Sequence, residues 1–126
     1  MYFWKKLISF FIVLNILTME DIYCDFDYVL DAIFDMVDSN DKSELILTME
    51  NVNVGLIEEG GCEALGEFIE VFSDDIDVIR SDYCKVIFGY LGVFVVLYYS
   101  VNLNITTFVA RTFYSIEDAD ELYISL

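Results

Sequence analysis

The sequence has no histidine and no proline, and its 126 residues include only 6 lysines and arginines against 23 aspartates and glutamates. Without an imidazole, a Ser-His or Cys-His catalytic couple and a mixed Cys/His zinc site are excluded. The formal net charge of −17 opposes direct nucleic-acid binding, which needs cations to displace phosphate counterions. Yet 57% of the residues are hydrophobic, which is too many for a disordered chain. The length fits one domain, so residues 1–126 are predicted to form a single domain.

Cysteines are also few. Cys24, Cys62 and Cys84 are widely spaced and form no C-x-x-C motif, so a disulfide framework is not expected. Free cysteines are commonly small buried thiols, and we interpret all three in that way. This interpretation favours a reducing compartment and hence a cytoplasmic protein.

Two apolar segments bear on the compartment. Residues 7–17 follow Lys5 and Lys6, as in a signal peptide, but no small-residue cleavage site follows and the run is shorter than the about 20 residues of a membrane span. We predict a buried core element there; the alternative is a secreted or membrane-associated protein that uses residues 1–17. Residues 86–101 are uncharged, β-branched and aromatic, which favours buried strands, with a membrane hairpin as the alternative.

The spacing of apolar residues predicts helices first. A helix is expected from Thr18, with Asp21 completing a capping box, to the turn at residues 38–41. Residues 45–57 alternate as an extended or bulged hairpin segment would. The helical period returns between Cys62 and Tyr83, in one helix or in separately capped pieces.

Strands are predicted next. Residues 85–91, 93–101 and 105–114 have strand composition, residues 115–121 form an acidic turn, and residues 122–126 close the fold as a short edge strand. The fold class is therefore α+β, with acidic amphipathic helices in the N-terminal half and an antiparallel β-meander in the C-terminal half around a single core.

Negative charge is concentrated between residues 20 and 82, while residues 83–116 contain no acidic side chain. Like charges at helical spacing repel, and no lysine is placed to offset them, which favours a cationic partner over mere solubility. The candidate partner-binding residues form two stripes: Asp27, Asp31, Asp35 and Asp38 in the first, and Glu63, Glu67, Glu70, Asp74, Asp75 and Asp77 in the second.

No catalytic or metal site is expected. Asp38-x-Asn40-x-Lys42 begins like a calcium loop, but Lys42 occupies a ligand position and the bidentate glutamate is missing. Nothing singles out a catalytic carboxylate pair, so we predict neither an enzyme nor a cofactor. Arg111 is expected to pair with an internal carboxylate, and the tyrosines to lie mostly in the core.

In size, charge balance, acidic stripes (Asp27/Asp31/Asp35 and Glu63/Glu67/Glu70) and lack of catalytic groups, the chain resembles the small acidic immunity proteins of bacterial nuclease toxins, including those of contact-dependent growth inhibition. The folds of these proteins are diverse, so the resemblance implies nothing about this one. It implies cytoplasmic binding of a basic, co-encoded nuclease toxin domain, which blocks its active site or its access to nucleic acid. The alternative is a secreted or membrane-anchored structural or interaction protein that uses residues 7–17 and 86–101 as apolar segments.

Overall fold

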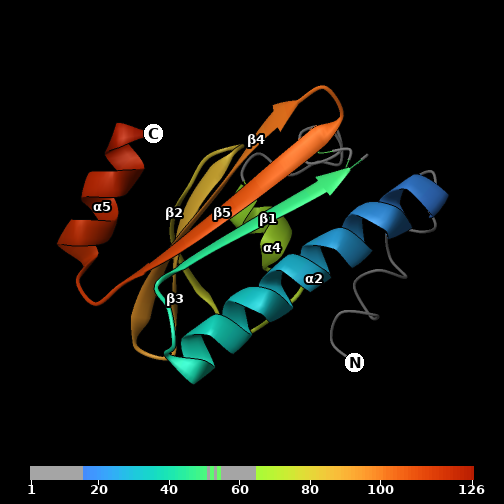
Figure 1. Ribbon diagram of the computed structural model, residues 1–126. Coiled ribbons are helices and arrows are strands. Elements are labelled where there is room, and N and C mark those ends of the chain that lie inside the picture. Colours follow the sequence, from blue (N-terminus) through green and yellow to red (C-terminus); the bar gives the residue numbers. More distant parts are fainter. Residues whose placement is uncertain (1–15, 51, 53, 55–64) are drawn as a thin grey trace.

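The protein is a five-stranded antiparallel sheet with helices on both faces (Figure 1). The computed structural model describes residues 16–50, 52, 54 and 65–126, with side chains in the first helix from Phe26 onward. The described helices are α2 (Ile16–Ser39), α4 (Leu65–Ile69) and α5 (Ile116–Ser125). The strands are β1 (Glu44–Glu50), β2 (Asp77–Ser81), β3 (Lys85–Tyr90), β4 (Val93–Asn102) and β5 (Ile105–Phe113). The predicted α+β class is confirmed.

Helix α2 matches the predicted first helix and ends where the turn residues predicted. Asn40 takes φ 54°, and its amide donates to the carbonyl of Met36 at 3.1 Å, which is the left-handed cap that asparagine tolerates. The start was placed too late, because the described helix begins at Ile16 and Thr18 lies inside it. Most of the apolar segment 7–17 lies outside the described residues.

Three strands of the predicted antiparallel β-meander are confirmed, as β3, β4 and β5. Strands β2, β3, β4 and β5 follow one another as antiparallel neighbours, and β1 adds to the outer side of β5 to give the order β1-β5-β4-β3-β2. The turn between β4 and β5 holds Leu103 and Asn104 at φ 50° and 68°, a two-residue connection that suits the twist of a hairpin. Strand β1 covers the first part of the segment predicted to be extended.

The helical prediction for residues 62–83 is largely wrong. Within residues 65–83, which the structure describes, only Leu65–Ile69 is helical, and Asp77–Ser81 is β2, which pairs with β3. Here pairing with a strongly β-forming neighbour overrides a local helical period, as tertiary context commonly does.

The C-terminal prediction is also wrong, because residues 115–126 form α5 and not a turn with an edge strand. Ser115 caps the helix by accepting a hydrogen bond from the Asp118 amide at 3.2 Å. Ala119 and Tyr123, one turn apart, are buried. Ser115 and Asp118 have the spacing of a capping box, so a signal was present in the sequence.

Apolar side chains pack on both faces of the sheet. The single core that the sequence predicts is therefore divided by the sheet into two apolar layers. Helices α2 and α4 cover one face, where Phe26, Phe68 and Phe108 meet with ring centroids 5.1–5.3 Å apart. Helix α5 covers the other face, where Tyr123 packs with Ile87 and Val96. The central strands β3 and β4 are thus buried from both sides, which confirms the prediction of buried strands for residues 86–101 and explains their lack of charge. None of the described helices is long and apolar enough to cross a membrane.

Candidate partner-binding surface

The acidic stripe of α2 lies opposite the buried side of the helix. Asp31, Asp35 and Asp38 are exposed, whereas Phe26 and Ile33 are buried. This arrangement follows from the 3.6-residue period, which places the aspartates on one line along the outer face.

Asp27 departs from the predicted stripe, because its side chain is half-buried. Burial raises the pKa of its carboxyl above the usual 3.8, and the negative charge of Asp31 one turn away raises it further. The charged form of Asp27 is therefore disfavoured. Its carboxyl is also less accessible to a partner than the exposed carboxyls of Asp31, Asp35 and Asp38.

The second acidic group does not form a helical stripe. Glu67 and Glu70 lie on and just after α4, Asp74 and Asp75 lie in the loop that follows, and Asp77 begins β2. All five are exposed, as predicted, although only Glu67 lies within a helix. Glu63 lies outside the described residues.

The two acidic groups meet at Tyr90, at the end of β3. The Tyr90 ring stacks on Phe34 of α2, with centroids 4.3 Å apart. Burial raises the pKa of the Tyr90 hydroxyl, and the charges of Asp38, Asp75 and Asp35 raise it further, in that order. Carboxylates that are about 40 residues apart in sequence thus act on the same hydroxyl. We call Phe34, Tyr90, Asp35, Asp38 and Asp75 the Tyr90 surface.

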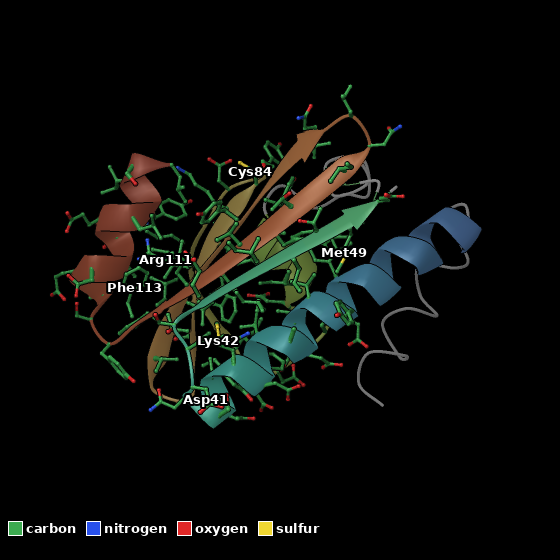
Figure 2. The ribbon with its side chains drawn as sticks, in the orientation of Figure 1. Asp41, Lys42, Met49, Cys84, Arg111 and Phe113 are labelled. Carbon is green, nitrogen blue, oxygen red and sulfur yellow. The ribbon has the colours of Figure 1, made fainter. Side chains whose placement is uncertain are left out.

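Three of the four basic side chains in the described residues, Arg80, Lys85 and Arg111, lie elsewhere, whereas Lys42 lies just after the C-terminal end of α2 (Figure 2). On the α5 side, Arg80 forms a salt bridge with Asp120 at 3.0 Å. Arg80 and Lys85 lie over the Tyr123 ring, at 4.7 and 4.4 Å from its centroid. The Lys85 ammonium also donates to the carbonyl of Tyr123 at 3.1 Å. Neither salt bridge within the described residues includes a member of the Tyr90 surface.

Arg111 does pair with a carboxylate, as predicted. Its Nε lies 3.6 Å from Glu44 Oε2, a long contact between side chains that are 43% and 52% exposed. Arg111 and Phe113 line an open groove of about 370 Å³ between β5 and α5, together with Asp118, Glu121, Leu122 and Ser125 (Figure 2). This groove was not predicted from the sequence, because it depends on α5 being a helix.

Two other predictions need correction. Cys84 is exposed and free, because it lies in the turn between β2 and β3 and not in a core strand. Tyr83 and Tyr114 are 42% and 78% exposed, so the tyrosines are less uniformly core residues than predicted. Cys62 and the side chain of Cys24 lie outside the described part of the chain. Within that part, no three side chains of the metal-ligating types are grouped closely enough to hold an ion.

No protein family, curated protein or solved structure matches this chain.

Proposed function

We propose that this protein is an immunity protein, a cytoplasmic inhibitor that binds the basic surface of a nuclease toxin domain through its own acidic surface. It has no catalytic role in this proposal. Binding would block either the active site of the toxin or its access to nucleic acid.

The Tyr90 surface is the observation that supports this proposal. An aromatic pair with three carboxylates close enough to act on the Tyr90 hydroxyl suits an arginine or lysine of a partner, which would gain cation–π contact with a ring and charge-assisted hydrogen bonds to the carboxylates. Tyrosine is enriched at protein interfaces, and Phe34 and Tyr90, which pack against the core on one side, are each left partly exposed next to the aspartates.

Charge segregation adds a second, kinetic reason. Arg80, Lys85 and Arg111 lie towards α5, and Lys42 is the one described basic residue next to the end of α2. The exposed aspartates of α2 form no salt bridge among the described residues. Nuclease substrate grooves are positively charged, so such a face would be steered to them, with association rates towards about 10⁸–10⁹ M⁻¹s⁻¹ at low salt.

The experiment is co-expression with the toxin domain encoded beside the gene, with growth and nuclease activity as readouts. The test variant is Asp35→Asn/Asp38→Asn/Asp75→Asn. The matched control is Glu117→Gln/Asp118→Asn/Glu121→Gln, which removes the same charge from exposed positions of α5. Thermal melts establish that both variants fold.

We expect the natural chain to restore growth and inhibit the nuclease, the control to do the same, and the test variant to lose at least about tenfold in affinity, mainly in association rate. Failure of the natural chain to protect would contradict the proposed function. Equal loss in both variants would mean that net charge, and not the Tyr90 surface, governs binding. A chain found in the membrane fraction would favour the secreted or anchored alternative.

A further inference from the structure

Strand β1 is the outermost strand of the sheet on one side. All seven of its residues pair with β5, and no other described strand pairs with them. In Figure 1 helix α2 runs alongside β1 on the side away from β5, and it packs on the core face of the sheet without replacing a strand there. Unpaired edges invite another strand, and natural proteins commonly block them with proline, lysine or a bulge. Strand β1 contains none of the three.

The register shows which backbone groups face outward. The Thr112 amide donates to the Ser43 carbonyl at 3.0 Å, one position before Glu44 pairs with Arg111. In an antiparallel ladder, hydrogen-bonded pairs alternate with non-bonded ones. Leu45, Leu47 and Met49 therefore direct their amides and carbonyls to β5. The outward-facing backbone groups belong to the alternate residues Glu44, Ile46, Thr48 and Glu50.

The side chains of these four residues are all exposed, on the α5 face of the sheet. Ile46 is 59% exposed in the middle of the strand, and a glutamate lies at each end. Glu44 already pairs with Arg111 of β5 at 3.6 Å, but this long contact leaves its side chain 52% exposed and accessible to a second cation. Helix α2 runs alongside β1 on the other face, so its acidic side chains add to the negative potential along this edge (Figure 1).

We infer that the β1 edge binds an extended segment of a partner protein as a sixth strand, with lysine or arginine opposite Glu44 and Glu50 and an apolar residue opposite Ile46. Main-chain hydrogen bonds would supply affinity and the alternate side chains specificity, as in strand addition generally. Because Glu44 and Glu50 are six residues apart on one face, the segment needs cationic side chains at its first and seventh positions.

Charge also decides against a second copy of this chain as the occupant. Antiparallel pairing of two β1 strands about their centre would place Glu44 of one copy opposite Glu50 of the other, twice. Like charges directly opposite each other destabilise a strand pair, and each chain already carries a net charge of −17. A cationic segment removes both penalties. This inference goes beyond the proposed function and does not depend on it, because it concerns a different surface.

The test uses two heptapeptides with blocked termini, Lys-Thr-Val-Thr-Ile-Thr-Lys and the matched control Glu-Thr-Val-Thr-Ile-Thr-Glu. Amide exchange by NMR is the site-specific readout. In the free protein, the outward amides of Ile46 and Thr48 should exchange rapidly, while those of Leu45 and Leu47 are protected by β5. The lysine peptide should protect Ile46 and Thr48 and bind about tenfold more tightly than the glutamate peptide, since opposite charges at two cross-strand positions replace like ones.

Two variants support the assignment. Thr48→Pro removes an outward amide that β5 does not accept, so the pairing of β1 with β5 should survive and peptide binding should be lost. Should that variant not fold, Glu50→Lys provides the test by reversing the preference for the terminal residue that lies opposite it.

The inference is overturned by equal binding of the two peptides, by no binding at millimolar peptide, or by protection of amides outside β1. Concentration-dependent dimers that protect Ile46 and Thr48 would make a second copy the occupant and would overturn it too. If Thr48→Pro inhibits the toxin as strongly as the natural chain does, the proposed function stands. That result would show that the toxin does not bind the β1 edge.

Discussion

Phe34 of α2 and Tyr90 of β3 stack with their ring centroids 4.3 Å apart and their planes 24° from parallel. This contact fixes the C-terminal half of the acidic helix against the end of a central strand. It brings two acidic groups to one surface, because Asp35 and Asp38 come with the helix and Asp75 with the loop before β2. The electrostatic consequence appears at the Tyr90 hydroxyl.

The first prediction concerns that hydroxyl. Burial first, and then Asp38, Asp75 and Asp35, raise the Tyr90 pKa above its usual 10.0. Asp38→Asn/Asp75→Asn should lower the Tyr90 pKa but leave it above 10.0, because burial remains. NMR titration of ring-labelled tyrosine, assigned with Tyr90→Phe, measures this. Asp118→Asn is the control and should leave the Tyr90 pKa unchanged.

The raised pKa of Tyr90 also makes the free energy of unfolding depend on pH. The native state holds the Tyr90 proton more tightly than the unfolded chain does, so the associated stability is present below pH 10.0 and falls as pH rises through the native pKa. Urea unfolding between pH 9 and 11 should show a shallower decline in Tyr90→Phe. An equal decline in both proteins would contradict the assignment.

The second prediction concerns Asp27, whose pKa is raised by burial and by Asp31. The stability associated with its proton is present below pH 3.8 and is lost as pH rises through the raised value. Asp27→Asn should therefore stabilise the protein at pH 7. The gain should be no less than the cost of a like-charge pair in a helix, about 0.2–0.5 kcal/mol, and it should vanish towards pH 3. Asp35→Asn, at an exposed position, is the comparison, and a larger gain there would contradict the role of burial.

How far the sequence predicts the fold depends on the range of the forces involved. Helix α2 and strands β3 to β5 were predicted because their periodicity and composition agree with their tertiary environment. Strand β2 was missed because its partner β3 decides its state. Helix α5 was missed because its acidic residues were interpreted as a turn, although Ser115 and Asp118 have the spacing of a capping box.

For the Tyr90 surface, the sequence predicted which acidic residues are exposed but not which of them lie together. Helical spacing correctly placed Asp31, Asp35 and Asp38 on an exposed face. It could not show that Asp75 joins them or that Tyr90 lies between them, because both facts depend on how α2 crosses the sheet. The edge position of β1 could not be predicted from local sequence either, because it depends on the order of all five strands in the sheet.

The third prediction tests how much α5 contributes to stability. Tyr123 is only 6% exposed and packs against Ile87 and Val96 on the second face. Tyr123→Ala should cost about 3 kcal/mol in the free energy of unfolding, which urea titration measures. Tyr114→Ala is the matched control, because Tyr114 is exposed and loses only a hydrogen bond to Asn40, worth about 1 kcal/mol. Comparable losses in the two variants would mean that α5 is not docked through Tyr123.

The fourth prediction concerns Gly66, where α4 packs closely against β2. A Cβ at this position would lie 2.7 Å from Val78 Cγ1 and 2.8 Å from Ser81 Cβ, closer than real side chains approach. Gly66→Ala should therefore destabilise the protein by about 1–3 kcal/mol, even though alanine is the better helix former. Gly89→Ala is the control, since the nearest atoms there lie 3.9 Å away, at ordinary contact distance. Urea titration measures both variants, and a Gly66→Ala variant as stable as the natural chain would contradict the close contact between α4 and β2.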